Sequence, residues 1–554
     1  MEKNWLPSYP EGVPAEIGLL EDASLAELME KACRRYADKT AFISMGRTLS
    51  YGELDRKAAE FAGWLQSVGL GKGKRVALMM PNLLQYPICL FGALRAGCTV
   101  VSCNPLYTPR ELEHQLKDSG AEVMVVVENF AHTVEQVLPH TAVRHVIVTP
   151  MGEMLGTLKG TLVNLVVRHV KKLVPAWRIP GAINFSTALA AGRRHGFQPV
   201  EISLDDLAFL QYTGGTTGVA KGAMLSHRNI VSNVTQAHAW IRGTVHEGEE
   251  LIVTALPLYH IFALTANCLT FLSFGASNLL IANPRDIPGF IKELKHHPFT
   301  AITGVNTLFN ALLNHPDFAA VDFSRLHVTL GGGMAVQQAV AERWQQVTGC
   351  ALAQAYGLTE TSPAATINPL DLPAFNGAIG LPISSTEVSI RNDAGVELPR
   401  GDVGEICIRG PQVTTGYWGR PDETAKAFTS DGFLLTGDMG YVNEKGFVYL
   451  VDRKKDIILV SGFNVYPNEV EDVVISHQGV REVAAIGVPH EHSGETVKIF
   501  VVRKDPDLTR EDLIAHCRTQ LTSYKVPHHV EFRDDLPKTN VGKVLRRALK
   551  EEGK

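Results

Sequence analysis

Residues 212–222 read Tyr212-Thr213-Gly214-Gly215-Thr216-Thr217-Gly218-Val219-Ala220-Lys221-Gly222, with four glycines, three threonines and one lysine. Glycine permits positive φ angles and close backbone approach, while threonine hydroxyls and a lysine ammonium donate hydrogen bonds to phosphate oxygens. We expect a short apolar strand over 208–212 before this loop, and a helix capped by Ser226 after it. The stretch therefore predicts a phosphate-binding loop between a buried strand and a helix.

The spacing of this loop differs from that of the Walker-type P-loop, in which Gly-Lys-Ser/Thr follows four free positions after the first glycine. Here Ala220 precedes Lys221. A flexible surface linker has a similar composition, but a linker has no reason to lie between a buried strand and a helix. The phosphate-binding interpretation is favoured for that reason.

The overall composition is that of an ordinary globular protein. A chain of 554 residues is too long for one core, and a net charge of -5 argues against a nucleic-acid-binding surface. The eight cysteines are scattered without a Cys-x-x-Cys pair, so neither a zinc site nor a disulfide framework is indicated. We find no signal peptide and no apolar run of membrane-spanning length, and we expect a cytoplasmic protein, free or held at a membrane surface.

Apolar runs that alternate with helical patterns predict an α/β fold. The runs at 75–80, 99–102 and 251–256 are typical of parallel strands covered on both faces. From residue 378 onward, short strands, glycines and prolines indicate a small β-rich subdomain. A charged segment then precedes a compact α+β module. We predict a large N-terminal domain over 1–452, with its β-rich part at 378–452, a hinge at 453–456 and a small C-terminal domain over 457–554.

Several further turns place polar groups after strands, where α/β folds hold ligands. Taken singly, each has an ordinary structural explanation, such as a satisfied core histidine or a carboxylate at a helix start. Their residue types nevertheless suit a nucleotide, because glycines admit a flat ring, tyrosine offers a π face and glutamate is a hard oxygen ligand. These turns contain His260, Gly331-Gly332-Gly333, Tyr356-Gly357-Leu358-Thr359-Glu360, Asp438 and Lys543.

Together the motifs resemble the AMP-forming acyl-CoA synthetase superfamily, in that family's order and over nearly the whole chain. The resemblance is greatest to the bacterial long-chain fatty-acid branch, in the sequences of residues 212–222, 453–456 and 461–467. The resemblance implies activation of a fatty acid by ATP to acyl-AMP with release of pyrophosphate, followed by transfer to coenzyme A. It also implies Mg²⁺ as a cofactor and a mobile C-terminal domain.

The resemblance assigns a role to each motif residue. Lys543 would bridge the attacking carboxylate and the α-phosphate, and His260 would order both reactants. Glu360, with Thr217, would bind the metal. The nucleotide would be held by Thr213, Gly214, Gly215, Thr216, Thr217, Gly218, Lys221, Gly331, Gly332, Gly333, Tyr356, Gly357, Thr359, Asp438 and Arg453.

The remaining assignments concern the hinge, coenzyme A and the acyl chain. Lys455 would be the pivot of the C-terminal domain, and Gly462 would lie on a loop that faces coenzyme A. The acyl pocket would be lined by Phe262, Gly304 and Val305. Two charges near Lys543, Lys538 and Arg546, are expected to be solvated.

The substrate class is less sharply defined. No acidic residue follows His260, which argues against an amino acid, and an uncharged lining suits an acyl chain. Leu264 stands where some long-chain members carry a gating Trp, so a gated tunnel of that type is not predicted. A medium-chain or aryl acid is the alternative substrate. A silent acyl-binding protein associated with the membrane is the alternative class, and it is disfavoured because Lys221, Glu360 and Lys543 are all present.

Residues 154–174 form a basic amphipathic segment. One helical stripe contains Leu155, Leu158, Leu162, Val166, Val170 and Leu173, and the basic residues are Lys159, Arg168, His169, Lys171 and Lys172. The favoured interpretation is a surface helix that packs its stripe on the domain, and the alternative is contact with the inner membrane surface. The sequence leaves the oligomeric state open, a homodimer included.

Overall fold

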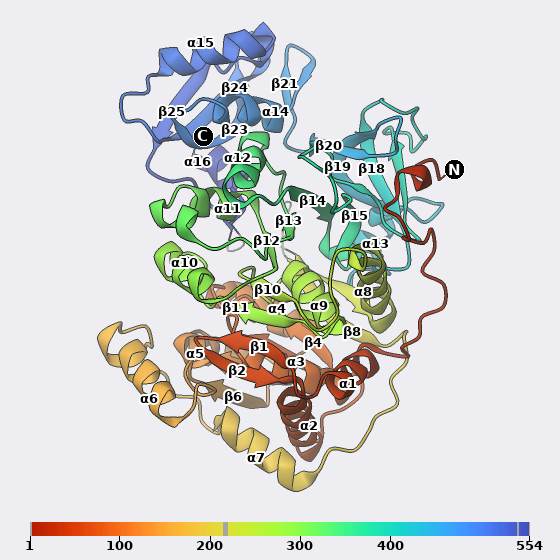
Figure 1. Ribbon diagram of the computed structural model, residues 1–554, viewed down its shortest axis with the longest axis vertical. Helices are drawn as coiled ribbons and strands as arrows, with labels where there is room; N and C mark the ends of the chain where they lie inside the picture. Colours follow the sequence, from red (N-terminus) through yellow and green to blue (C-terminus); the bar gives the residue numbers. More distant parts are fainter. Residues whose placement is uncertain (1–2, 214–219, 540–541, 553–554) are drawn as a thin grey trace.

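A computed structural model describes residues 3–213, 220–539 and 542–552. Its strands form a seven-stranded sheet, a nine-stranded sheet, a four-stranded sheet and a five-stranded sheet. Figure 1 shows the C-terminal region, in blue, at the top of the molecule and the first helices and strands, in red, toward the bottom. The predicted α/β class with a β-rich part and an α+β C-terminal part is confirmed.

The seven-stranded sheet has the order β7-β6-β5-β3-β4-β8-β9, and every neighbouring pair is parallel except β8 with β9. Alternate residues of β5 enter different cores: Val125 faces one, while Met124 and Val126 face the other. Strands buried on both faces need continuous apolar runs, which is why the sequence marks them clearly. The strands are β3 (Arg75–Met79), β4 (Thr99–Ser102), β5 (Val123–Val127), β6 (His145–Thr149), β7 (Ile183–Asn184), β8 (Leu207–Thr213) and β9 (Lys221–Ser226).

The nine-stranded sheet has the order β16-β15-β14-β13-β12-β10-β11-β1-β2. The strands from β14 to β1 in this order are parallel, and the outer strands β2, β15 and β16 pair antiparallel. The strands are β1 (Thr40–Ser44), β2 (Arg47–Ser50), β10 (Leu251–Thr254), β11 (Ser277–Leu280), β12 (Ala301–Gly304), β13 (Val328–Gly331), β14 (Leu352–Gly357), β15 (Ala364–Ile367) and β16 (Leu381–Pro382).

One apolar core joins the two large sheets. It contains strand residues from both, such as Val76 and Val253, and helix residues such as Ile88 and Ile230. The helices that contribute to it are α1 (Leu25–Arg35), α2 (Tyr51–Ser67), α3 (Gln85–Arg95), α7 (Phe185–His195), α8 (His227–Ile241), the π-helical η5 (Ala263–Thr270), α9 (Phe271–Ser273), α10 (Ile287–His296), α11 (Asn306–Leu313) and α12 (Gln338–Thr348). On the other face of the seven-stranded sheet lie α4 (Pro109–Ser119) and α5 (Ala131–Val137).

Short 3-10 turns complete the connections. They are η1 (Leu6–Ser8), η2 (Glu128–Phe130), η3 (Leu138–His140), η6 (Pro316–Ala320), η7 (Thr359–Thr361) and η8 (Ser523–Lys525).

The element after the phosphate loop differs from the prediction. Ser226 caps α8 in a capping box with Asn229, as expected. However, the strand β9 lies between the loop and this helix and pairs antiparallel with β8. Lys221 therefore lies on a strand opposite Thr213, at the base of a hairpin. The stretch Lys-Gly-Ala-Met-Leu-Ser has only three consecutive apolar residues, so its pairing with β8 is what reveals it as a strand.

The β-rich part contains the antiparallel strands β17 (Glu387–Arg391), β18 (Gly404–Arg409), β19 (Leu434–Val442) and β20 (Val448–Arg453), with the helix α13 (Pro421–Ala427). The C-terminal sheet covers apolar cores on both faces. Its strands are β21 (Ile458–Val460), β22 (Phe463–Val465), β23 (Val480–His490), β24 (Gly494–Arg503) and β25 (His529–Arg533), and its helices are α14 (Pro467–Ile475), α15 (Arg510–Gln520) and α16 (Arg546–Glu552).

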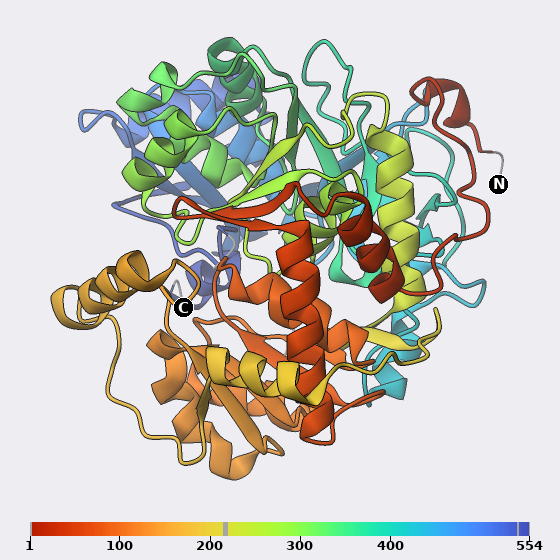
Figure 2. The same ribbon diagram turned by 60° about the horizontal axis from the view of Figure 1, so that its bottom comes forward.

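The amphipathic segment forms α6 (Thr157–Leu165) followed by the π-helical η4 (Val166–Val170). Figure 2 shows α6, in light orange, standing out from the body of the molecule. Leu158 is 88% exposed and Val170 is 73% exposed, whereas Leu155 is only 6% exposed, so most of the apolar stripe does not pack on the domain as expected. Within the described ranges, no helix is both long and apolar enough to cross a membrane.

Candidate active site

The described ends of the phosphate loop are close to two acidic side chains. Lys221 forms a salt bridge with Glu423 of α13, and its ammonium lies 5.4 Å from the centre of the Tyr417 ring. The Tyr417 hydroxyl donates a 2.8 Å hydrogen bond to the Glu360 carboxylate. Tyr417 thus brings Lys221 and Glu360 to the same place. The predicted residues Gly214, Gly215, Thr216, Thr217 and Gly218 lie outside the described residues.

Tyr417 and Glu423 were not predicted from the sequence. Tyr417 belongs to a turn that pairs beside β9, since Met224 donates its amide to the Gly416 carbonyl at 3.0 Å. A single tyrosine in a turn carries no sequence signal for this position. Only the folded chain, which brings residues near 417 beside residues near 222, reveals its contact with Glu360.

The acidic side chains at this place suit one kind of metal ion. In the described parts of the chain, no group of three or more His, Cys, Asp or Glu side chains could hold a metal by itself. Glu360 offers a carboxylate that Tyr417 already orients. Mg²⁺ is commonly bound through one or two carboxylates together with substrate phosphates and water. The donor set therefore fits a Mg²⁺ ion that arrives with a nucleotide.

A second cluster lies near the ends of β14 and β20 and in the middle of β19. The Tyr356 hydroxyl donates a 2.7 Å hydrogen bond to Asp438, whose carboxylate lies 3.4 Å from the Arg453 guanidinium. Asp438 and Arg453 face each other in the antiparallel register of β19 and β20. Burial raises the pKa of Tyr356 well above its usual range, and Asp438 raises it further. The phenol therefore stays protonated and holds the carboxylate.

Lys543, from the C-terminal tail, lies near enough to Asp438 and Arg453 for their charges to act on its pKa. Its Cε lies 3.7 Å from the position a Cβ on Gly333 would occupy, and Val305 and Phe262 border the same position. Burial lowers the pKa of the Lys543 ammonium to about 8, and Arg453 lowers the pKa further while Asp438 opposes this effect. Motifs separated by hundreds of residues thus meet around the half-buried Lys543 side chain.

His260 belongs to the same region. Burial lowers the pKa of its imidazole to about 4, and the charge of Lys543 acts in the same direction. The ring is therefore neutral near pH 7 and can donate or accept a hydrogen bond. Its Nδ1 accepts a hydrogen bond from the Phe262 amide at 3.3 Å.

At the other predicted glycines, the space that a side chain would take is filled by neighbouring protein atoms. A Cβ on Gly331 would lie 2.6 Å from Val336 Cγ2, and one on Gly304 would lie 2.8 Å from Phe309 Cζ. At Gly332 a Cβ would meet Phe262 at 3.0 Å, and at Gly357 it would lie 1.7 Å from the Pro363 carbonyl. These positions shape the walls of the site from behind. Thr359 begins the 3-10 turn that carries Glu360.

The charged segment at the base of the C-terminal region is tied to both sides. Lys454 forms ion pairs with Asp393 at 2.7 Å and Glu405 at 3.1 Å, both in the β-rich part. Asp456 lies 3.7 Å from Arg546 of the C-terminal region. Lys455 is the residue between these two anchors.

Arg546 was expected to be solvated, and this expectation was wrong. Its side chain is only 15% exposed and forms ion pairs with Asp452 at 3.1 Å and Glu471 at 2.8 Å. Lys538 was also misjudged, because it pairs with Glu482 at 2.7 Å. Partners so distant along the chain cannot be read from the residues around 546 or 538.

Gly462 lies elsewhere. It forms the exposed tip of the hairpin between β21 and β22, where Ser461 and Gly462 have φ angles of 50° and 83°. A Cβ on Gly462 would meet nothing within 4 Å. In this arrangement the structure does not bring Gly462 to the Lys543 cluster.

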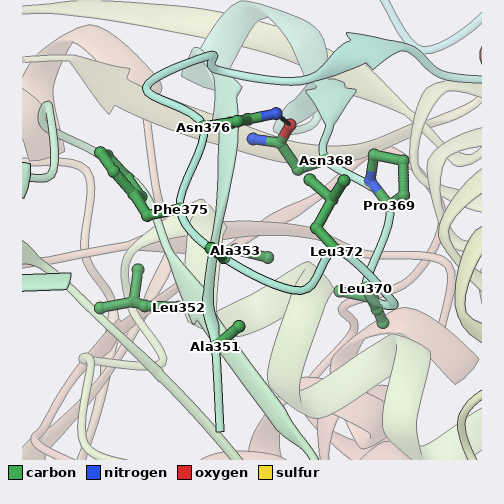
Figure 3. A pocket seen from close by; sticks show the side chains of 10 residues that line it. Ala351, Leu352, Ala353, Asn368, Pro369, Leu370, Leu372, Phe375 and Asn376 are labelled. Atoms are coloured by element: carbon green, nitrogen blue, oxygen red, sulfur yellow. Dashed lines mark hydrogen bonds between the residues drawn. The ribbon is translucent and has the colours of Figure 1, made fainter. Parts of the chain in front are cut away.

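A separate small pocket lies at the start of β14, at the opposite end of the strand from Tyr356. Figure 3 shows its wall of apolar side chains, with the Asn376 amide donating a 3.0 Å hydrogen bond to Asn368. Its lining comes from Ala351, Leu352, Ala353, Asn368, Pro369, Leu370, Leu372, Ala374, Phe375 and Asn376. This pocket is bordered by none of Tyr356, Asp438, Arg453 and Lys543.

Comparison with known families gives two matches. The family described as AMP-binding enzyme matches residues 29–418, and the AMP-binding enzyme C-terminal domain matches residues 469–543.

Individual relatives match along the whole chain. A long-chain-fatty-acid–CoA ligase of Escherichia coli is 59% identical over 100% of this chain and 99% of its own length. One of Haemophilus influenzae is 54% identical over 100% of this chain and 99% of its own length. A crystal structure of ATP-bound MatB from Rhodopseudomonas palustris is 29% identical, with a TM-score of 0.81 over 95% of this chain and 98% of that chain.

Proposed function

This chain belongs to the family of AMP-binding enzymes, and we propose that it is a long-chain fatty-acid–CoA ligase. It activates a fatty acid with ATP and transfers the acyl group to coenzyme A. The observation that carries the proposal is the 59% identity to a long-chain-fatty-acid–CoA ligase over the full chain. The position of Lys543 beside the Tyr356–Asp438–Arg453 cluster supports it.

In the first half-reaction, a carboxylate oxygen of the fatty acid attacks the α-phosphorus of ATP. The bond from that phosphorus to the bridging oxygen breaks, and pyrophosphate leaves. Both reactants are anionic, so a buried cation between them offsets their repulsion and aligns them. We assign this role to Lys543. The neutral His260 imidazole would orient the carboxylate by a hydrogen bond.

The nucleotide would be held by groups that the fold has already arranged. Asp438 would accept hydrogen bonds from the ribose hydroxyls, with Arg453 beside it, and the Tyr356 ring would stack on the adenine. Thr359 would donate to the α-phosphate. The adenine would lie against Gly331, Gly332, Gly333 and Gly357.

The β- and γ-phosphates would lie between the glycine loop and α13. There Lys221 and Thr213 would act with Gly214, Gly215, Thr216, Thr217 and Gly218. A bound Mg²⁺ would neutralise phosphate charge, and we assign Glu360 and Thr217 as its protein ligands. Glu423 forms a salt bridge with Lys221 in this structure, so the ATP phosphates would have to displace the Glu423 carboxylate from Lys221.

In the second half-reaction, the sulfur of coenzyme A attacks the acyl carbonyl carbon and AMP leaves. Lys543 lies beside Gly333 in the proposed site, and we propose that its loop withdraws before a second substrate reaches the adenylate. The segment around Lys455 is the position for this movement, since Lys454 is anchored to the body and Asp456 to the C-terminal region. Rotation there would bring Gly462 toward coenzyme A.

Pyrophosphate release with palmitate, ATP and Mg²⁺ tests the function directly. We expect release that depends on all three, and palmitoyl-CoA when coenzyme A is added. A panel of acids separates the alternatives. The proposed acyl pocket is lined by Phe262, Gly304 and Val305. Faster turnover of a medium-chain or aryl acid would revise the substrate assigned to this pocket. No pyrophosphate release with any acid would contradict the assignment as an enzyme.

We also propose that residues 154–174 contact the surface of the inner membrane. The exposed apolar side chains are Leu158, Leu162, Leu165, Val170 and Leu173. Beside them, His169, Lys171 and Lys172 are exposed and complement acidic headgroups, whereas the charge of Arg168 is taken by an ion pair with Glu128. An exposed apolar face bordered by cations is typical of an interfacial helix.

A further inference from the structure

The helix α11 contacts the C-terminal region at two points on one face. The Thr307 hydroxyl donates a 2.9 Å hydrogen bond to the Gly542 carbonyl, next to Lys543. The Asn310 side-chain amide donates a 2.9 Å hydrogen bond to the Arg481 carbonyl of β23. Residues three positions apart lie on the same face of a helix. Figure 1 shows α11 at the junction between the body and the C-terminal region.

The close contact at Gly542 favours glycine, because a side chain there would be strained and would crowd Thr307. Gly542 has a φ angle of +86°, and a Cβ there would lie 2.8 Å from Thr307 Oγ1. Gly542 and Lys543 are also both hydrogen-bonded to Thr539: its Oγ1 accepts the Lys543 amide at 3.0 Å, and its carbonyl accepts the Gly542 amide at 3.0 Å. Thr307 therefore binds a carbonyl whose own residue and its neighbour Lys543 are both held by Thr539.

The second anchor is also held in place from behind. Asn314 donates a 3.0 Å hydrogen bond to the Asn310 side-chain oxygen, so the Asn310 amide group is turned toward Arg481. The Asn314 oxygen in turn accepts a 2.8 Å hydrogen bond from Arg343 of α12. A chain of side chains thus fixes the face of α11 that meets the C-terminal region.

We infer that Thr307 is a positioning residue for the first half-reaction, with Asn310 as its companion. This inference rests on the proposed function. The Thr307 hydroxyl holds the carbonyl that precedes Lys543 and so fixes where the ammonium lies. Since Lys543 must withdraw for the second half-reaction, these bonds act only while the site is closed. Their loss slows formation of acyl-AMP and leaves thioester formation unchanged.

Thr307→Val keeps the shape of the side chain and removes its donor. A net hydrogen bond of this kind corresponds to about a 3- to 10-fold effect on an equilibrium. We expect single-turnover pyrophosphate release with palmitate to slow by about that factor. Thioester formation from supplied palmitoyl-adenylate and coenzyme A should stay at the wild-type rate. Thr307→Ser, which keeps the hydroxyl, should restore the first rate.

The matched control is Thr235→Val. Thr235 donates a 2.8 Å hydrogen bond to the Val231 carbonyl within its own helix, so the same chemical change crosses no interface. This control should alter neither half-reaction. Asn310→Ala removes the second bond across the interface and must show the same selective loss as Thr307→Val.

Two outcomes overturn the inference. One is an equal loss of both half-reactions in Thr307→Val or Asn310→Ala, which indicates general damage to the fold. The other is an unchanged rate of pyrophosphate release in either variant. Failure of the proposed function is distinguishable, because the wild-type protein itself would then release no pyrophosphate with any acid.

Discussion

The hydroxyl of Tyr417 donates a 2.8 Å hydrogen bond to the carboxylate of Glu360, and the same tyrosine ring lies 5.4 Å from the Lys221 ammonium. One aromatic side chain from the β-rich region therefore orients the proposed metal ligand beside the proposed phosphate lysine. The two charges come from separate motifs, and neither motif contains the residue that links them.

Tyr417→Phe removes this hydrogen bond and keeps the ring. Because partners of metal ligands commonly change metal affinity by about 10- to 100-fold, we expect the Mg²⁺ concentration for half-maximal pyrophosphate release to rise by at least about tenfold. Tyr449→Phe, on a ring that stacks against Tyr441, is the control and should leave the Mg²⁺ dependence unchanged. Identical Mg²⁺ titrations for Tyr417→Phe and the wild type would contradict the role.

The buried ammonium of Lys543 predicts an alkaline limb in the first half-reaction. Its pKa lies near 8, because burial, Arg453 and Lys455 lower the pKa more than Asp438 raises it. The nearby His260 imidazole is neutral at this pH and adds no charge. The protonated form is present below this pKa and is lost as the pH rises through it. The kcat/KM for pyrophosphate release should therefore fall above about pH 8.

Measuring pyrophosphate release without coenzyme A keeps the thiol out of this titration. Lys543→Arg introduces a guanidinium that stays charged, so the remaining rate of pyrophosphate release should no longer fall above about pH 8. A wild-type profile that is flat up to pH 10 would show that Lys543 does not titrate in this step.

The exposed stripe on α6 and η4 can be tested with vesicles. Leu158→Glu and Val170→Glu remove apolar surface that is 88% and 73% exposed, so the fold should tolerate both. Full burial of such a side chain contributes roughly 1.5–3 kcal/mol, so each change should weaken sedimentation with phosphatidylglycerol vesicles by at least about tenfold.

Leu19→Glu is the control for this test, because Leu19 is 96% exposed and lies outside the segment. It should bind the vesicles as the wild type does. Unchanged vesicle binding in both stripe variants would exclude the membrane contact. Light scattering that gives twice the mass of one chain for the wild type, and not for the variants, would assign the stripe to a second copy of the chain instead.

Local and periodic features were predicted well from the sequence. The run at 123–127 alternates between two cores, which requires apolar residues at every position, and Ser226 caps α8 through its own side chain. Such features depend on neighbours in the sequence. The order of the motifs likewise predicted the family to which the chain belongs.

Features set by distant partners were missed. Lys221–Ser226 is a strand because β8 pairs with it, and Arg546 is buried because Asp452 and Glu471 surround it. Tyr417 reaches Glu360 only after the β-rich part folds against β9. The apolar stripe near Leu158 has the pattern of a packed helix, and the sequence could not show that Leu158, Leu162 and Val170 stay exposed.

The central claim is that Lys543 serves one half-reaction and must leave for the other. Its most direct test is Lys543→Ala, assayed separately for pyrophosphate release with palmitate and for thioester formation from supplied palmitoyl-adenylate. Loss of a preorganised charge at a reacting centre commonly costs about 10²- to 10³-fold. We predict a loss of at least that size in pyrophosphate release and a wild-type rate of thioester formation. An equal loss in both half-reactions would contradict the account.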